Sequence, residues 1–184
     1  MQNHLKNELH NILSGKSEVR FGTIIQAIAG YLSDGSQTSA NPENEKHHDK
    51  QETERLEFFI SEQNLWVDGL DLSQYVSEGA EQKVYLKDSE HVLKLNDAIY
   101  YNSWTDYFHN LLLHNYFFSD TAYELVGFTK DHGVLFAIVK QNYVSITSET
   151  NLDGVRNFLI ANGFQNNRNN DYINAELGII RRFA

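Results

Sequence analysis

The apolar residues of the first 32 positions recur with helical spacing. Leu5, Leu9 and Ile12 follow one another at intervals of four and three residues, so they share one face of a helix. A second stripe of this kind runs from Ile24 to Leu32, and a break at residues 14–17 separates the two. Helices this short are only marginally stable alone, so we expect both to dock, either on the rest of the chain or on a partner.

A strongly polar segment follows these helices. Residues 33–52 contain almost no side chains whose burial could repay the ordering entropy, so we expect a flexible linker there. A helical pattern resumes at about residue 51 and ends near residue 62, with Leu56 and Ile60 on one face. The pattern divides the chain into a helical segment (1–32), a linker (33–52) and a folded region (53–184).

From residue 65 onward, short apolar runs replace the helical spacing. Residues 82–87 and 91–95 are predicted to form two strands joined by a turn at Asp88 and Ser89. Residues 122–128 and 134–139 have the form of a second hairpin. Two antiparallel hairpins favour an α+β fold over a doubly wound sheet.

Two helices and one further strand complete this prediction. Residues 103–118 place Trp104 and Phe108 on one helical face, and Ser103 is a plausible N-cap. Residues 151–162 predict another helix that ends at Gly163, and residues 172–180 predict a last strand.

Composition restricts the classes of function. The chain has 15 Lys and Arg against 25 Asp and Glu, a formal net charge of −10, so a nucleic-acid partner is not expected. It contains no cysteine, which excludes disulfides and thiolate metal sites. No segment has the length and apolarity of a membrane span or a secretory signal, so we expect a cytoplasmic protein without a membrane partner.

One glycine and one lysine carry the strongest chemical signal. Gly79 stands at a bend between strands, where the lack of a Cβ lets backbone N–H groups approach a phosphate. Lys94 lies within the strand 91–95, between apolar neighbours, and can meet the same phosphates as a point charge. The alternative is that neither residue binds a ligand: Gly79 only allows the bend, and Lys94 is a solvated lysine on an edge strand.

The other polar clusters have plainer explanations. His47 and His48 lie in the polar segment, where solvated side chains are expected, and Asp68 and Asp71 flank a turn. Residues 14–17, Ser-Gly-Lys-Ser, lack the upstream glycine and strand of a nucleotide-binding P-loop, so they are rejected as one.

The order of these elements matches a protein-kinase small lobe. The chain from about Trp66 to Ile180 resembles the kinase-like domain of polyvalent proteins of phages and bacterial mobile elements. The resemblance implies a small lobe with about five antiparallel strands and one packed helix, followed by the start of a helical lobe. The segments that carry it are residues 78–85, 92–95, 111–118, 121–128, 139–144 and 174–179.

Roles for single residues follow from the resemblance by position. Residues 79–83 would cover the phosphates of ATP, Lys94 would contact them, and residues 139–144 would form the hinge beside the adenine. The helix 103–118 would supply a glutamate that holds the lysine, but it contains none, and Asp106 is its only carboxylate. The nucleotide-binding residues implied in this way are Gly79, Ala80, Glu81, Lys83, Lys94, Val139 and Gln141, with ATP and Mg²⁺ as cofactors.

The carboxyl end raises the question of catalysis. Phosphoryl transfer uses an Asp as the base, an Asn and a second Asp for Mg²⁺, and in the family these follow the strand that resembles residues 176–180. The chain ends at Ala184. The expectation is therefore a truncated or degenerate kinase-like domain that binds ATP at most, with no catalytic residue in this chain. The alternatives are a non-catalytic interaction module that uses the N-terminal helices, and part of a longer active protein.

Overall fold

The computed structural model describes residues 2–34, 42–79, 82–144, 149, 151–168, 171–174 and 179–182. These residues fall into two compact units. The larger comprises Asn11–Tyr143, and the smaller combines Met1–His10 with Val144–Ala184. The boundary lies within the first helix, α1 (Gln2–Leu13), whose extent confirms the first predicted helix.

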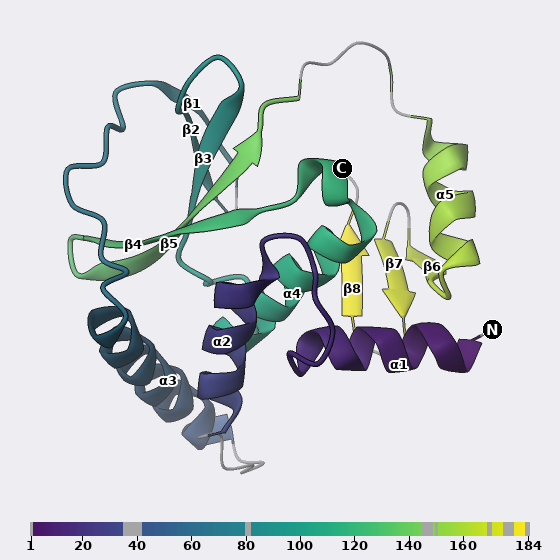
Figure 1. The fold of residues 1–184 in the computed structure, drawn as a ribbon, viewed down its shortest axis with the longest axis horizontal. Coiled ribbons are helices and arrows are strands. Elements are labelled where there is room, and N and C mark those ends of the chain that lie inside the picture. The colour runs from purple at the N-terminus through teal and green to yellow at the C-terminus, as the bar shows by residue number, and fades with distance from the viewer. Residues whose placement is uncertain are drawn as a thin grey trace. The chain divides into compact units, whose positions relative to one another are not determined.

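The larger unit contains a five-stranded antiparallel sheet (Figure 1). Its strands stand in the order β1-β2-β3-β5-β4, so β3 is the central strand, with β2 and β5 on its two sides. The α+β class and both predicted hairpins are confirmed. The bounds of the strands are Tyr75–Glu78 for β1, Lys83–Leu86 for β2, His91–Asn96 for β3, Glu124–Asp131 for β4 and Val134–Asn142 for β5.

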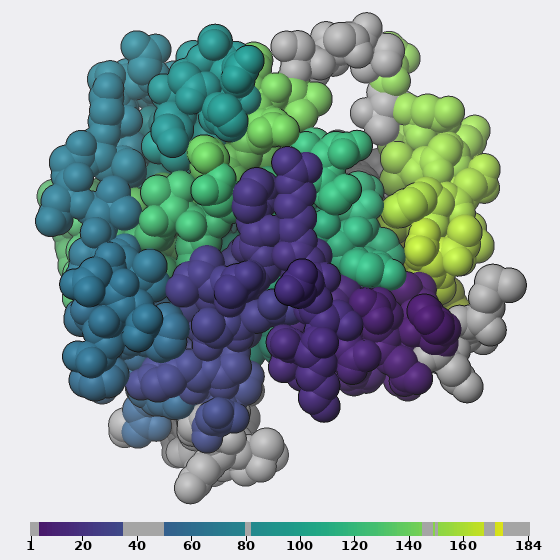
Figure 2. All heavy atoms as spheres, in the orientation of Figure 1, coloured from purple at the N-terminus to yellow at the C-terminus, as the bar shows by residue number. Residues whose placement is uncertain are grey.

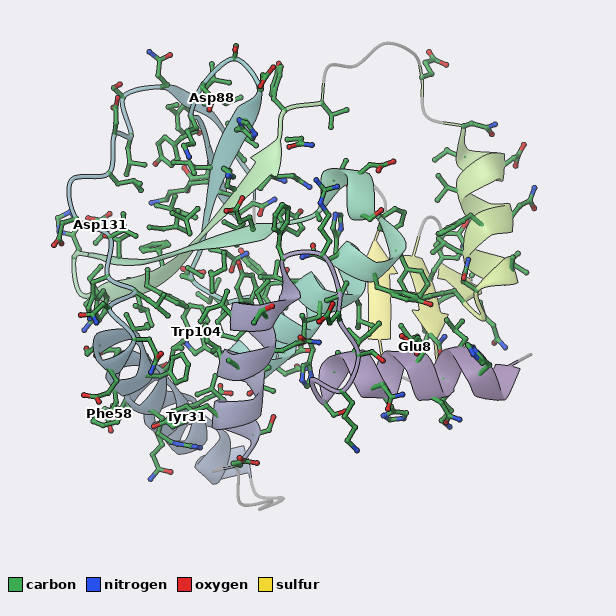
Figure 3. All side chains as sticks on the ribbon, viewed as in Figure 1. Glu8, Tyr31, Phe58, Asp88, Trp104 and Asp131 are labelled. Carbon is green, nitrogen blue, oxygen red and sulfur yellow. The ribbon has the colours of Figure 1, made fainter. Side chains whose placement is uncertain are left out.

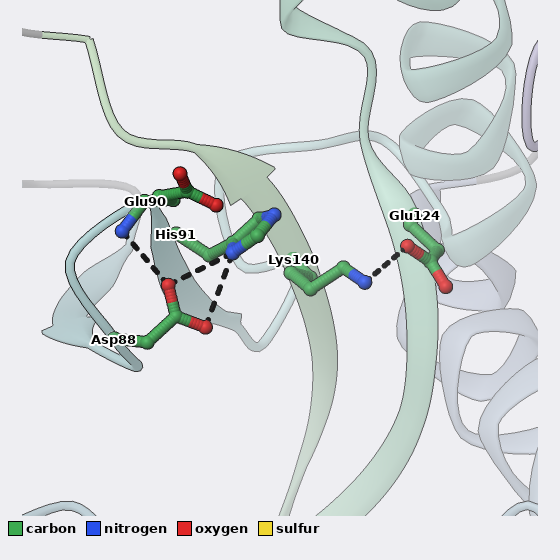
Figure 4. Close-up of polar contacts among 5 residues, drawn as sticks. All are labelled: Asp88, Glu90, His91, Glu124 and Lys140. Carbon is green, nitrogen blue, oxygen red and sulfur yellow. Dashed lines mark hydrogen bonds and ion pairs between the residues drawn. The ribbon is translucent and has the colours of Figure 1, made fainter.

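Local hydrogen bonds form the turn that joins β2 to β3. An Asp88 Oδ1 oxygen accepts a bond from the Glu90 backbone N–H at 2.8 Å and lies 2.9 Å from Nδ1 of His91 (Figure 4). These bonds favour the ionised carboxylate, which lowers the pKa of Asp88. Asp88 and Asp131 mark opposite ends of the sheet, because the two hairpins point in opposite directions (Figure 3).

The helix between the hairpins is α4 (Trp104–Phe117). The Ser103 Oγ atom accepts a bond from the Asp106 backbone N–H at 3.0 Å, which confirms the predicted N-cap. A carboxylate from another helix adds to this cap: Glu52 accepts bonds from the backbone N–H groups of Trp104 and Thr105 at 2.8 and 3.0 Å. A short 3₁₀ helix, η1 (Ser119–Thr121), leads from α4 toward β4.

Two further helices pack beside α4 in the larger unit. The apolar stripe of α2 (Gly22–Ser33) is buried, and α2 contacts both α4 and α3 (Pro42–Glu62). In Figure 2 the atoms of α2 and α3 lie side by side on one face. The Arg55 guanidinium of α3 donates to the carbonyls of Tyr31 and Leu32 at the carboxyl end of α2, at 2.6 and 3.0 Å. Helix α2 was expected to dock either on the rest of the chain or on a partner, and the structure shows it docked on the rest of the chain.

The start of α3 corrects the predicted linker. The helix begins at Pro42, so residues 42–52 are helical, whereas the linker was predicted to extend to residue 52. Proline has the backbone angle of a first helical turn, and the Glu, Lys and Gln residues after Pro42 have a high intrinsic helix propensity. Within the predicted linker, residues 35–41 lie outside the described residues.

The sheet of the larger unit has two different faces. On the α4 face, the Phe128 ring of β4 packs against the Phe108 ring of α4, with ring centres 6.2 Å apart. On the other face, which we call the outer face, a second apolar cluster includes side chains of the segment before β1. This cluster consists of Leu93, Leu95, Phe136 and Ile138, with Val67, Leu70, Leu72 and Tyr85 packed against it.

The smaller unit contains α5 (Leu152–Ala161) and a three-stranded sheet. Its strands are β6 (Gln165–Arg168), β7 (Asp171–Asn174) and β8 (Ile179–Arg182), in the order β6-β7-β8. The predicted helix 151–162 is confirmed, and Gly163 ends it with a positive φ of 83°. The single strand predicted at 172–180 corresponds to parts of β7 and β8, with residues 175–178 outside the described residues.

None of the helices in the described ranges is both long and apolar enough to cross a membrane.

Candidate functional site

Lys94 occupies the middle of the central strand β3. Its neighbours across the ladder are Val84 on β2 and Val139 on β5. Directly paired residues of an antiparallel sheet point to the same face, and the contacts of Lys94 show that this is the α4 face. The lysine side chain is half-buried, which is uncommon for a residue type that is mostly exposed.

A tyrosine holds the ammonium group of Lys94. The Lys94 Nζ atom donates to the Tyr123 hydroxyl at 3.4 Å and lies 5.2 Å from the centre of the Tyr123 ring. The first contact is a long hydrogen bond and the second is within the range of a cation–π interaction. Tyr123 is therefore a described residue whose side chain contacts the ammonium group of Lys94 in two ways.

Helix α4 in turn holds Tyr123. Asn115, which is 1% exposed, accepts a bond from the Tyr123 backbone N–H at 2.7 Å and donates to its carbonyl at 2.8 Å. The His114 ring lies with its centre 4.5 Å from that of Tyr123. The helix thus acts on Lys94 through Tyr123, from two successive residues near its carboxyl end.

The partners of other lysines differ from those of Lys94. Lys130 lies 2.8 Å from a Glu57 oxygen, and Lys140 lies 2.6 Å from a Glu124 oxygen (Figure 4). No described carboxylate lies within ion-pair distance of Lys94. Its positive charge is therefore not neutralised by any of the described side chains.

Asp106, the carboxylate of the predicted helix, lies in the first turn of α4. Its two oxygens accept bonds from the Asn102 backbone N–H at 3.2 Å and from the Asn110 side chain at 3.3 Å. These contacts stabilise the start of the helix. Asp106 makes no described ion pair with Lys94 and does not take the place of the family's glutamate.

Helix α4 also carries a buried hydroxyl group, that of Tyr107. Tyr107 is 2% exposed, and its hydroxyl has no hydrogen-bond partner among the described residues. Burial raises the pKa of Tyr107 well above its usual range, and the neighbouring Tyr101 and Tyr123 raise it further. The group therefore remains a neutral phenol that can donate one hydrogen bond.

The side chain of Lys83 does not lie on the same face of the sheet as that of Lys94. It pairs with Leu95, the residue after Lys94, so its side chain lies on the outer face. There the Lys83 Nζ atom lies 5.4 Å from the centre of the Phe136 ring. It lines a pocket of about 290 Å³ on that face, together with Leu70, Leu72, Tyr85, Leu95, Phe136 and residues at the end of β4.

The two predicted hinge residues lie on the same face as Lys94. Val139 stands between Lys94 and Leu125 in the ladder and is 1% exposed, so its backbone groups serve the sheet. Gln141 is half-buried, and its side chain donates to the Thr121 carbonyl at 2.6 Å. These contacts connect the end of β5 to the turn that leads into Tyr123.

The predicted phosphate-covering loop is only partly described. Gly79 is exposed, and a Cβ at this position would have no atom within 4 Å. Its backbone N–H donates to the Gln82 carbonyl at 3.0 Å. Ala80 and Glu81 lie outside the described residues.

Sequence reasoning did not find Tyr123 or Asn115. Tyr123 was part of a segment that resembled the family, but no spacing rule relates it to Lys94, which lies 29 residues earlier. Asn115 lies in an otherwise apolar stretch of the helix, and the structure shows it to be a buried, hydrogen-bonded core residue. An amide inside an otherwise apolar helical stripe was the only available signal.

The fold and this site together define the class of the protein. A mixed α+β unit with a five-stranded antiparallel sheet, a helix between its third and fourth strands and a lysine on the third strand is compatible with a kinase-like fold. Residues 49–182 match the model of the family described as the serine/threonine/tyrosine kinase found in polyvalent proteins. The chain therefore belongs to this family. No curated protein and no solved structure matches the chain.

Membership of this family implies ATP and Mg²⁺ as ligands. The ammonium of Lys94 has a suitable charge and position for a phosphate. Among the described residues, no group of three or more His, Asp or Glu side chains could hold a metal ion. Lys94 thus supplies a positive charge without a described counter-ion, and the described residues offer no complete set of metal ligands.

Proposed function

We propose that the chain is a kinase-like domain that binds the phosphates of ATP through Lys94. The observation that carries this proposal is the position of Lys94: half-buried on the α4 face, contacting Tyr123, and without a described carboxylate partner. A cation in partly desolvated surroundings attracts an anion more strongly than one in water.

The proposal is limited to binding. Phosphoryl transfer needs a base and metal-bound charge neutralisation in addition to a lysine. The side chains described at Lys94 and at its partner Tyr123 are a phenol, an imidazole, an amide and apolar groups. They can position a phosphate, and we assign them no role in proton abstraction.

Thermal unfolding of the full chain with ATP tests the proposal. A ligand at about one hundred times its Kd stabilises the folded state by ~2.7 kcal/mol, which raises the Tm of a chain of this size by roughly 5–10 °C. We expect that shift for the wild type and a much smaller one for Lys94→Met. Lys83→Met is the matched control, because it removes a lysine from the other face of the same sheet.

Two outcomes would contradict the proposal. One is the absence of any Tm shift in the wild type at millimolar ATP. The other is an equal shift in the wild type and in Lys94→Met. A loss of the shift in Lys83→Met alone would move the phosphate site to the pocket on the outer face.

A further inference from the structure

We infer that Tyr123 is the positioning residue of Lys94, and that the site thereby keeps an ammonium whose charge is free for a phosphate. This inference rests on the proposed function and deepens it. It assigns to a neutral side chain, placed by the turn before β4, the orienting role that the family resemblance gave to a glutamate of the helix.

The first step is the geometry of the pair. The hydroxyl of Tyr123 accepts from Lys94 Nζ at 3.4 Å, and its ring lies 5.2 Å from the same nitrogen. Both contacts leave the net charge of the pair positive. A carboxylate in the same place would cancel that charge, and a phosphate would then have to compete with it for the ammonium.

The second step is the rigidity of Tyr123. Both of its backbone groups bond to the Asn115 side chain, which is buried. Its ring is in contact with the His114 ring, and Gln141 ties the preceding turn to β5 through Thr121. A tyrosine whose backbone is fixed and whose ring packs against His114 offers Lys94 a partner in a defined position, so less conformational entropy is lost when a phosphate binds.

The third step concerns the ligand. A long lysine side chain loses rotamer entropy when it is fixed. Prior orientation by Tyr123 removes part of this cost, so we expect its loss to weaken phosphate binding about threefold to tenfold. The ligand class is the polyphosphate of a nucleotide, and inorganic pyrophosphate contains the same anionic group without the base.

The binding test uses four variants of the full chain with ATP and, separately, pyrophosphate. Tyr123→Leu removes the ring and the hydroxyl, and we expect threefold to tenfold weaker binding of both ligands. Tyr123→Phe keeps the ring, and we expect less than a threefold loss. Tyr123→Glu supplies a carboxylate and should weaken binding more than Tyr123→Leu does. Tyr85→Leu, on the outer face, is the control that should bind as the wild type does.

A second measurement needs no ligand and separates this inference from the proposed function. A lysine side chain this close to an aromatic ring has ring-current shifts in the NMR resonances of its ε-methylene group. We expect these shifts for Lys94 in the wild type and in Tyr123→Phe, and random-coil values in Tyr123→Leu.

The outcomes are distinct. Failure of the wild type to bind ATP and pyrophosphate would end the proposed function, while the NMR comparison would still decide whether Tyr123 positions Lys94. Unchanged Lys94 resonances in Tyr123→Leu, or tighter phosphate binding by Tyr123→Glu, would overturn the inference.

Discussion

The side chain of Asn115 binds both backbone groups of Tyr123. Its Oδ1 atom accepts from the Tyr123 N–H at 2.7 Å, and its Nδ2 atom donates to the Tyr123 carbonyl at 2.8 Å. The same amide also donates to the Arg20 carbonyl at 2.9 Å, just before α2. One buried residue of α4 therefore connects the turn that carries Tyr123 with the segment that leads into α2.

Replacement of this amide should destabilise the larger unit. In Asn115→Ala, three hydrogen bonds are lost and their partly buried backbone partners remain unpaired, so we expect the free energy of unfolding to fall by about 2–4 kcal/mol. Urea unfolding followed by tryptophan fluorescence reports on this unit, since Trp66 and Trp104 both lie in it. The control is Asn102→Ala, an exposed position, with a change below ~0.5 kcal/mol. Equal effects of the two substitutions would contradict the role given to Asn115.

The contact of Glu52 with α4 should also be measurable. Its carboxylate accepts bonds from the N–H groups of Trp104 and Thr105 and from the Thr105 hydroxyl. In Glu52→Gln the shape is kept but the charge at the helix N-terminus is lost, so we expect a destabilisation of about 1–2 kcal/mol. Glu54→Gln removes a charge from the same helix, where Lys50 lies 3.9 Å away and both side chains are exposed. That control should change stability by less than ~0.5 kcal/mol, and a larger effect there than at Glu52 would refute the capping role.

Replacement by alanine should lower the stability at Gly127 but not at Gly79. Gly127 has a φ of 153°, and a Cβ there would lie 2.5 Å from the Leu65 carbonyl oxygen and 2.6 Å from a Val67 methyl group. Gly127→Ala must push the segment at residues 65–67 away from β4, and we expect a loss of roughly 2 kcal/mol or more. Gly79→Ala meets no atom within 4 Å and should leave stability unchanged.

Gly79→Ala is also a test of the phosphate-covering loop. If the Gly79 backbone approaches a phosphate, alanine there should weaken ATP binding while the Tm without ligand stays the same. Unchanged ATP binding would leave Lys94 as the residue that carries the phosphate contact and would remove Gly79 from the site.

His109 on α4 predicts a pH dependence of stability. Burial lowers the pKa of His109, and the nearby Asp106 and Glu52 only partly offset this effect. Below the ordinary value near 6.5, the unfolded chain therefore takes up the proton first, and stability falls as the pH falls through that value toward the lower folded pKa. The stabilising effects of Asp71 and Asp88, whose pKa values are lowered from 3.8, are lost only at more acidic pH.

Urea unfolding at pH 7.5 and pH 5.5 measures this dependence. We expect the wild type to lose more stability between the two values than His109→Gln does, because glutamine does not titrate. The same loss in both proteins would show that other groups cause the pH dependence.

Local periodicity was sufficient to predict most of the elements of the larger unit. The spacing of apolar residues predicted α2, α4 and the hairpins β2–β3 and β4–β5, because a helix or a strand reveals its buried face in the sequence itself. It did not predict the start of α3, because the first residues of this helix have helix propensity but no apolar periodicity. It also missed β6, whose residues Gln-Asn-Asn-Arg show no apolar alternation.

Lys83 and Lys94 show the limit of such reasoning at the candidate site. Both are lysines on adjacent strands, and the family resemblance gave both a role beside the same phosphates. The register of β2 and β3 places Lys83 opposite Leu95, so the two ammonium groups lie on opposite faces of the sheet. A shift of one residue in register would have brought them to one face.

The sequence by itself determined most of the elements, their order and the family, because these depend on residue types and on short-range spacing. Only the tertiary structure decided which residues meet: Tyr123 with Lys94, Asn115 with Tyr123, and Lys83 with Phe136 on the outer face. These contacts join residues on different elements of the fold. They depend on strand register and on the packing of α4 against the sheet, which no local pattern encodes.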